Sequence, residues 1–305
     1  MGDVIHTLPA AAALRRSFPE GMLSWLIRPR WAPLLEGNPD VDRAIPLARE
    51  VGATLRTIEM LRQDHFDLAV DFQGLMQSAG VAKAAGPVRL VGFGKGAVRE
   101  RLAASLYSQT VEPTSAHVVD RNMELASAAA GVPIESRARE FPLPAGTPEG
   151  SLPQQPFVLA SPLAGWGSKQ WPLERWSELA ALLDLPLVVN GPPSSQRELS
   201  MIKGAVVHLS GVAGLIDATR HATAVIGLDS GPLHLAAALA KPGVALFGPT
   251  DPARNGPYGT SFRVLRDAQA VTNYHRRDEP DASMRAITPA MVAEALHDVL
   301  QGRAQ

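Results

Sequence analysis

The stretch at residues 225–252 constrains the fold most, because it joins two apolar strands and a helix in a fixed order. Residues 224–228 are uniformly apolar and predict a buried strand. A polar turn at 229–232 leads into an Ala- and Leu-rich segment, which predicts a helix ending before Pro242. Residues 244–247 form a second apolar run. Strand, helix and strand make a βαβ unit, so we expect an α/β fold with a parallel sheet.

The turn in this unit has the chemistry of an anion site. Asp229 or Ser230 can cap the helix, and Pro232 suits its first turn because proline has no N–H group to satisfy. Gly231 permits close approach of a ligand, and a phosphate there would meet the positive end of the helix dipole. His234, one turn on, can face the same anion. A capped helix with one half-buried histidine explains the same spacing, so both interpretations stay open.

Composition narrows the class of protein. The chain has 305 residues, 46% of them hydrophobic, and a formal net charge of -1, which indicates a globular protein of two domains and gives no bulk charge for nucleic acid. The absence of cysteine excludes disulfides, zinc–thiolate sites and thiol nucleophiles. No apolar run has the length of a membrane span, and Asp3 followed by Arg15 and Arg16 does not fit a signal peptide. We therefore expect any membrane contact to be peripheral.

Strand and helix patterns alternate along both halves of the chain, as in doubly wound domains. A Pro- and Gly-rich connector at 133–155 places the predicted domain boundary at residue 150, giving an N-terminal domain at 1–150 and a C-terminal domain at 151–287. An amphipathic helix is expected at 288–301. The other expected strands lie at 22–27, 42–47, 68–72, 88–93, 157–160, 186–190 and 206–209, and the other expected helices at 10–16 (after a loop at 2–9), 31–35, 55–63, 73–85, 117–130, 171–183, 196–203 and 212–221.

Four stretches, in this order, resemble one enzyme family. They are GDVIHTLPA at 2–10, DLAVDFQGLMQSA at 67–79, SKQWPLERW at 168–176 and GLDSGPLHLAAALAKPGVALFGPTDP at 227–252. Together they resemble the ADP-heptose–lipopolysaccharide heptosyltransferases of glycosyltransferase family 9. RERLAASLY at 99–107 and HVVDRNMELA at 117–126 are most similar to the heptosyltransferase I branch. Each stretch alone is weak, but the ordered set covers nearly the whole chain.

The resemblance implies a GT-B fold, in which two Rossmann-like domains face each other across a cleft and the last helix packs back on the first domain. It also implies an inverting, metal-independent transfer of L-glycero-D-manno-heptose from ADP-heptose to Kdo of lipid A–Kdo. No cofactor, metal or nucleic acid is expected. The implied protein is a monomer in the cytoplasm, peripheral on the inner membrane, where its acceptor lies.

The resemblance assigns chemical roles to three residues. Asp3 matches the general base that takes the acceptor hydroxyl proton, although the same carboxylate would also cap the following helix. Lys169 matches a cation that neutralises the departing diphosphate, and its alternative is a solvated loop lysine. His234 would hydrogen-bond the donor, or else fill an apolar helix face.

Further binding residues follow from the matching positions. They are Gly2, His6, Ser168, Ser195, Asp229, Ser230, Gly231, Pro232 and Arg99. Ser194 and Ser195 stand where many relatives have a Glu, which leaves ribose recognition open. The basic residues Arg89, Lys95, Arg99 and Arg101 are expected to cluster after a strand and meet an anionic acceptor, or to form a solvated face.

The chain departs from the family pattern at its start. Relatives carry an apolar strand before GDVIHTLPA, whereas here the motif follows Met1 directly. We expect a version extended upstream to be more stable and more active than this one. Two alternatives stay open: a family relative that uses another nucleotide-sugar or core acceptor, and a binding protein that retains the nucleotide site without catalysis.

Overall fold

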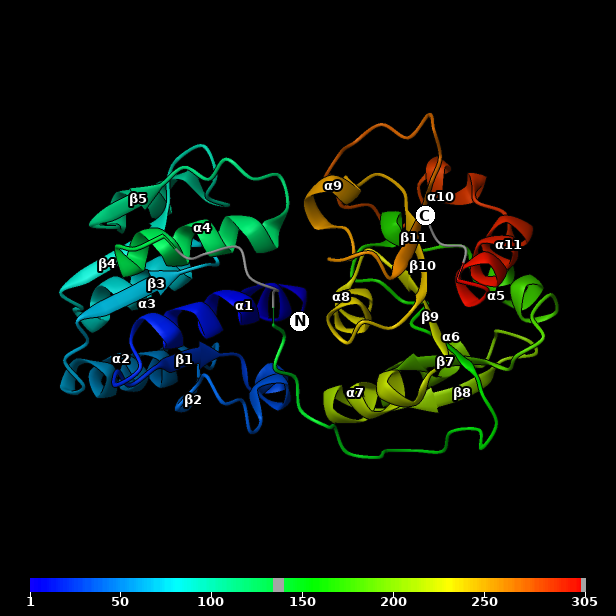
Figure 1. Ribbon diagram of the computed structural model, residues 1–305, viewed down its shortest axis with the longest axis horizontal. Helices are drawn as coiled ribbons and strands as arrows, with labels where there is room; N and C mark the ends of the chain where they lie inside the picture. Colours follow the sequence, from blue (N-terminus) through cyan, green and yellow to red (C-terminus); the bar gives the residue numbers. More distant parts are fainter. Residues whose placement is uncertain (134–139, 303–305) are drawn as a thin grey trace. The chain divides into compact units, whose positions relative to one another are not determined.

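The computed structural model describes residues 1–133 and 140–302. The chain forms two compact units, one of Met1–Ile5 with Leu143–Gln305 and the other of His6–Pro142 (Figure 1). The part of the predicted connector at 134–139 lies outside the described residues. Each unit is described by itself.

The C-terminal unit is built on one parallel sheet of six strands in the order β11-β10-β9-β6-β7-β8. Its strands are β6 (Val158–Ala160), β7 (Leu187–Gly191), β8 (Val206–Leu209), β9 (Ala224–Leu228), β10 (Gly243–Phe247) and β11 (Phe262–Arg266). Its α-helices are α5 (Leu173–Ala180), α6 (Gln196–Leu199), α7 (Val212–His221), α8 (Gly231–Ala238), α9 (Pro252–Asn255), α10 (Ala282–Ala286) and α11 (Pro289–Leu300), with 3₁₀ turns η3 (Gly167–Lys169) and η4 (Pro193–Ser195). The predicted βαβ unit is therefore confirmed as β9, α8 and β10.

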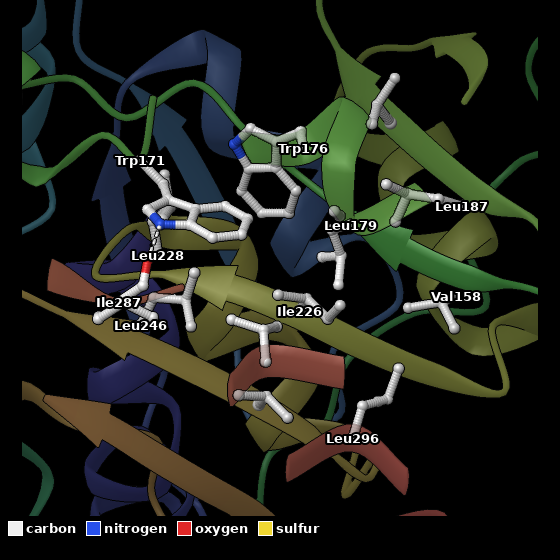
Figure 2. Packing of buried hydrophobic residues seen from close by; sticks show 14 of the residues in the cluster. Val158, Trp171, Trp176, Leu179, Leu187, Ile226, Leu228, Leu246, Ile287 and Leu296 are labelled. Carbon is white, nitrogen blue, oxygen red and sulfur yellow. Dashed lines mark hydrogen bonds between the residues drawn. The ribbon is translucent and has the colours of Figure 1, made fainter. Parts of the chain in front are cut away.

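Both faces of this sheet are buried, which explains why its strands are uniformly apolar. On one face, Ile226 and Leu246 belong to a large core cluster that includes Trp176 and residues of α11 (Figure 2). On the other face, Ala245 and Phe247 pack with Leu233 of α8. Successive residues of a strand point to opposite faces, so an apolar run fills both cores at once.

Two tryptophans tie the segment after β6 to the last helices. Trp171 and Trp176 meet edge to face, with ring centroids 5.0 Å apart at 86°. The indole N–H of Trp171 donates a hydrogen bond of 3.0 Å to the carbonyl oxygen of Ile287 (Figure 2). Both rings are almost completely buried. This packing fixes the start of α5 and therefore the loop that precedes it.

Helix α11 packs within the C-terminal unit. Its apolar residues Val292, Leu296 and Val299 join the same core cluster as Trp171 and Trp176, and the helix contacts α5, β10 and β11. The sequence predicted that this helix packs back on the N-terminal domain, whereas the structure places it in the core of the C-terminal unit. Its amphipathic pattern predicts one buried face but does not specify the surface that covers it.

The division between the units also falls earlier than the predicted boundary at residue 150. Residues from Leu143 onward belong to the C-terminal unit because they bond to α7. The Arg220 guanidinium donates to the carbonyl oxygens of Leu143 and Pro144. The Glu149 carboxylate accepts from the backbone N–H groups of Gly211 and Gly214, at the start of α7.

The N-terminal unit holds two separate parallel sheets, one of two strands (β1-β2) and one of three (β3-β4-β5). Its strands are β1 (Ser24–Ile27), β2 (Arg43–Pro46), β3 (Leu68–Asp71), β4 (Arg89–Phe93) and β5 (Gln109–Val111). Its helices are α1 (Gly2–Ser17), which begins in the other unit, α2 (Val51–Gln63), α3 (Met76–Ala85) and α4 (Val118–Ala130), with 3₁₀ helices η1 (Pro29–Leu35) and η2 (Arg101–Leu106).

Helix α1 begins at Gly2, so the loop expected at 2–9 is wrong. Ile5 and Leu8 are fully buried, and their burial outweighs the poor helix propensity of Pro9 inside the helix. The expectation had placed Asp3 in a loop, and the structure places it in the first helical turn.

The family-like stretch at 67–79 owes its turn to a buried carboxylate. Asp71, at the end of β3, accepts hydrogen bonds from the backbone N–H groups of Gln73 and Gly74 and from the hydroxyls of Ser78 and Tyr107. Burial and the Asp71 charge raise the pKa of Tyr107. These hydrogen bonds explain why Asp71, Gly74 and Ser78 occur at this spacing in the stretch at 67–79: they form the turn between β3 and α3.

Candidate functional site

The candidate site lies where the chain reverses its direction across the C-terminal sheet. Strand β6 pairs with both β7 and β9. The chain leaves β6 toward β7 but leaves β9 toward β10, on the opposite side. Loops that follow two such neighbouring strands diverge at the carboxyl edge of the sheet, which is the usual ligand position in open α/β folds. Lys169 follows β6, and Asp229 follows β9.

Three predicted residues meet at this point. The Nζ atom of Lys169 is 2.6 Å from Oδ2 of Asp229, and Nε2 of His234 is 3.7 Å from Oδ1 of the same carboxylate. The side chains of Asp229 and His234 are each only 6% exposed. Asp229 therefore holds a cation and an imidazole on its two oxygens.

Asp229 is ionised at neutral pH. Burial by itself would raise its pKa, but the interaction with His234 and the charge of Lys169 outweigh burial and lower the pKa to about 2. An ionised buried carboxylate needs a partner of opposite charge, and Lys169 supplies it. The pair fixes the lysine ammonium at the end of β9.

Helix α8 directs its amino end toward the same carboxyl edge of the sheet. Ser230 is the N-cap in an extended conformation, its side chain caps no backbone N–H, and Pro232 lies at the start of the helix. Among the described residues, the buried Oγ atom of Ser230 has no hydrogen-bond partner. The first N–H groups of a helix have no acceptor within it. The backbone N–H of Gly231, the helix dipole and the Ser230 hydroxyl are therefore available to an anion.

The first residues of α1 pack directly on α8. A Cβ atom on Gly2 would lie 2.8 Å from Cδ2 of His234, and one on Gly231 would lie 2.6 Å from Cβ of Met1. A side chain at Gly2 would therefore displace the buried His234 ring, and one at Gly231 would displace the Met1 side chain. Asp3 follows Gly2 in the first turn of α1 and is exposed. The structure thus brings Gly2, Gly231 and His234 together, with Asp3 next along the chain.

Ser168 forms hydrogen bonds to the neighbouring segment at 275–277. It is 1% exposed, its N–H donates to the carbonyl oxygen of Arg277 at 2.9 Å, and its hydroxyl donates to that of His275 at 3.4 Å. A Cβ atom on Gly167 would collide with the backbone of Asp278. The bonds of Ser168 hold the segment at 275–278, which is a structural alternative to its predicted role in binding the donor.

Sequence reasoning missed two residues at this site. The indole of Trp166 lies 4.3 Å from Nζ of Lys169 and 5.0 Å from Cζ of Arg276, measured to the ring centroid. The aromatic and basic run YHRR at 274–277 was a signal for the second of these. Nothing in that run indicated which lysine or aromatic residue it would meet.

Other predicted residues lie elsewhere. Ser195 ends η4, after β7, and is half-buried. His6 is buried in the N-terminal unit, with its ring 6.0 Å from that of His117. Arg99 follows β4 in the same unit.

The expected cluster of four basic residues does not form as predicted. Arg89 is the first residue of β4, so it lies at the opposite end of that strand from the loop with Lys95, Arg99 and Arg101. Its guanidinium donates to the Gln109 amide oxygen and to the carbonyl oxygen of Ala129. Arg89 therefore supports the sheet and α4.

Two further features concern metals and membranes. Within residues 1–133 and 140–302, no three His, Asp or Glu side chains gather as a metal site would require. No helix in these ranges combines the length and apolar character needed to cross a membrane.

Comparison with known proteins adds a family and a fold. The profile of glycosyltransferase family 9 (heptosyltransferase) matches residues 54–283. Lipopolysaccharide heptosyltransferase 1 of Pseudomonas aeruginosa is 30% identical over 282 residues, which cover 86% of this chain and 79% of that protein.

Two solved structures share the fold. The E. coli heptosyltransferase WaaC with ADP has a TM-score of 0.78 and 24% identity, covering 98% of this chain and 97% of that one. The E. coli ADP-heptose lps heptosyltransferase II has a TM-score of 0.80 and 24% identity, covering 100% and 97%. Both are similar over nearly their whole length.

Proposed function

Because the chain belongs to glycosyltransferase family 9 and is a glycosyltransferase, we propose that it moves L-glycero-D-manno-heptose from ADP-heptose to Kdo of the lipopolysaccharide inner core. Heptose transfer is supported by the name of the similar P. aeruginosa enzyme, a lipopolysaccharide heptosyltransferase 1, and an ADP-linked donor is supported by the similar E. coli structures, WaaC with ADP and ADP-heptose lps heptosyltransferase II. The observation that carries the proposal is the group of Lys169, Asp229 and His234 at the switch point of the C-terminal sheet.

The diphosphate of the donor binds at the amino end of α8. The N–H of Gly231 and the hydroxyl of Ser230 donate hydrogen bonds to phosphate oxygens, and the helix dipole favours their negative charge. Lys169 lies beside this position because Asp229 holds it. As the bond from the anomeric carbon to the diphosphate breaks, the ammonium stabilises the charge that develops on the leaving oxygen. A lysine in this role supplies the positive charge that a metal ion supplies in other transferases.

Asp3 acts as the general base. The Kdo hydroxyl oxygen attacks the anomeric carbon from the face opposite ADP, its proton passes to the Asp3 carboxylate, and ADP leaves with the bonding electrons. Attack from the opposite face inverts the anomeric configuration. The position of Asp3, directly after the Gly2 that packs on His234, supports this role.

His234 and Asp229 orient the donor end of the site. The ionised Asp229 keeps the imidazole of His234 in place through its second oxygen. The imidazole then has a defined orientation for a hydrogen bond to a donor hydroxyl or phosphate. The acceptor is an anionic lipid, so the protein works at the membrane surface on its cytoplasmic face.

The test is release of ADP from ADP-heptose in the presence of a lipid A–Kdo acceptor, with ADP-glucose and a UDP-sugar as comparison donors. Each assay is run with and without EDTA, because the proposal requires no metal. With the acceptor present, we expect turnover with ADP-heptose and none with ADP-glucose or the UDP-sugar. Equal turnover with another donor, or loss of turnover in EDTA, would contradict the proposal.

The general base is tested by Asp3→Asn. Its control is Asp120→Asn, because Asp120 also lies in the first turn of a helix, α4 of the N-terminal unit. Both changes remove the same favourable interaction with a helix dipole. We expect Asp3→Asn to lower kcat by roughly 10²-fold or more while ADP binding is retained, and Asp120→Asn to retain turnover. Equal turnover in the two variants would exclude Asp3 as the base.

A further inference from the structure

The indole of Trp166 carries two cations. Its ring centroid lies 4.3 Å from Nζ of Lys169 and 5.0 Å from Cζ of Arg276. Both distances are within the range of about 6 Å over which an aromatic face attracts a cation. The ring therefore links the lysine of the proposed donor site to an arginine from a segment much later in the chain.

The backbone fixes the segment that carries Arg276. Ser168 bonds to the carbonyl oxygens of His275 and Arg277, on either side of Arg276, and the N–H of Asp281 donates to the carbonyl oxygen of Ser168 at 3.3 Å. Gly167 leaves no room for a side chain against Asp278. Arg276 is therefore held beside η3 by main-chain contacts as well as by the indole.

The three cations of this region differ in whether a carboxylate partners them. Lys169 is paired with Asp229, and Arg277 lies 3.8 Å from the Asp281 carboxylate. Among the described residues, no carboxylate forms an ion pair with Arg276, whose guanidinium contacts the Trp166 ring. The two cations on this ring repel each other, and an anion bound beside Arg276 would offset that repulsion.

The pair of Lys169 and Asp229 is also nearly neutral as a whole. Asp229 is already ionised, and a diphosphate adds several more negative charges. The single positive charge of Lys169 cannot neutralise both the Asp229 carboxylate and the diphosphate. A second cation is needed, and Arg276 is the one that shares an aromatic ring with Lys169. A guanidinium also presents paired donors that match phosphate oxygens.

We propose that Arg276 is a second anchor for the diphosphate of the donor and that Trp166 is a positioning residue that holds Arg276 and Lys169 on one ring. The inference rests on the donor site proposed above. It adds the segment at 274–278 to that site and assigns it the recognition of the second phosphate.

The experiment compares the binding of ADP and AMP by calorimetry, in EDTA, for wild type, Arg276→Gln and Arg276→Lys. We expect Arg276→Gln to weaken ADP about tenfold and AMP less than about threefold, since one charge-assisted contact to the second phosphate is lost. Arg276→Lys keeps the charge but loses the paired donors, so its ADP affinity should be intermediate. Arg277→Gln is the matched control from the same loop, and it should retain ADP affinity.

The role of Trp166 is tested by Trp166→Leu and Trp166→Phe. Leucine removes the aromatic face, so ADP binding should weaken at least as much as in Arg276→Gln, whereas phenylalanine keeps a face and should restore most of the affinity. If Trp166 only supported the fold, its substitution would weaken the binding of ADP and of AMP equally. Thermal unfolding of each variant shows whether the fold is retained.

Three results would overturn the inference: unchanged ADP affinity in Arg276→Gln, equal weakening of ADP and AMP, or a Trp166→Phe variant that behaves like Trp166→Leu. A wild-type protein that binds ADP but transfers no heptose would contradict the proposed function and leave the Arg276 comparison valid. A wild-type protein that binds no ADP would contradict both.

Discussion

The two units of this chain use parallel strands in different ways. In the C-terminal unit, four of the six strands, β10, β9, β6 and β7, pair on both sides, and only β11 and β8 are edges. In the N-terminal unit, among the described strands, only β4 pairs on both sides. Edge strands and two-stranded pairs contribute less independent stability than strands inside a sheet.

This difference shows where a fixed charged site can form. Lys169 and Asp229 follow the neighbouring inner strands β6 and β9, whose registers are set on both sides. A contact of 2.6 Å between a half-buried ammonium and a buried carboxylate needs that rigidity. In the N-terminal unit, Lys95 and Arg99 lie in the loop between β4 and the short 3₁₀ helix η2, which begins at Arg101. We therefore place donor binding in the C-terminal unit.

The largest predicted effect concerns the C-terminal core. Trp176 is completely buried, and Trp176→Ala should lower the free energy of unfolding of this unit by about 3–5 kcal/mol. Hydrogen exchange should then accelerate in β6, β7 and β9. Exchange in β1 and β2 should stay unchanged, and an equal acceleration there would show that the two units unfold as one.

The next effect is on catalysis. Lys169→Gln removes the cation beside the diphosphate and should lower kcat by about 10²–10³-fold. Lys203→Gln is the control, because Lys203 is an exposed lysine of the same unit. Arg99→Gln, in the N-terminal unit, should leave ADP affinity unchanged. A loss of ADP affinity in Arg99→Gln would contradict the difference between the two units.

The third effect depends on pH. The Asp229 pKa lies at about 2 in the folded chain, below its usual value, so its ionised form stabilises the fold at every pH above about 4. That contribution is lost as the pH falls toward 2. Asp229→Asn should cost about 2 kcal/mol at pH 7, and the difference from wild type should shrink between about pH 4 and pH 2. Urea unfolding across this range measures it.

Asp42 is the counterpart in the N-terminal unit. A hydrogen bond from the Leu23 N–H and the neighbouring Arg15 lower its pKa, but its side chain is 45% exposed. Asp42→Asn should therefore cost less than about 1 kcal/mol. A cost equal to that of Asp229→Asn would show that burial does not separate the two carboxylates.

The smallest effect concerns α11, the last helix of the C-terminal unit. Thr288 caps α11 by accepting a hydrogen bond from the N–H of Met291 at 3.3 Å. Thr288→Ala should destabilise the C-terminal unit by about 1 kcal/mol, and Thr288→Ser should retain most of the stability. Destabilisation that appears only in the N-terminal unit would contradict the packing of α11 on α5 and β10.

The sequence predicted the inner strands of the C-terminal sheet well, because β6, β7, β9 and β10 are apolar runs bounded by turns. It missed β11, Phe262 to Arg266, because two arginines interrupt its apolar residues and the strand is only partly buried. It also missed the helical start of α1, where the burial of Ile5 and Leu8 decides against local propensity. Burial of this kind depends on the rest of the fold.

The candidate site was predictable where a motif places residues next to one strand end. Asp229, Ser230 and His234 were identified in this way, and so was Lys169, through the resemblance. Trp166 and Arg276 were not, because their contact depends on how Ser168 holds a distant loop. Spacing in the sequence does not reveal such a contact.

Hydrogen exchange with and without ADP tests the central claim most directly. We predict that ADP slows exchange at the N–H groups of Gly231 and Leu233, at the start of α8, and in the segment at 166–169. Strands β1 to β5 of the N-terminal unit should exchange at the same rate in both conditions. Protection confined to the N-terminal unit, or no protection at the start of α8, would contradict the account.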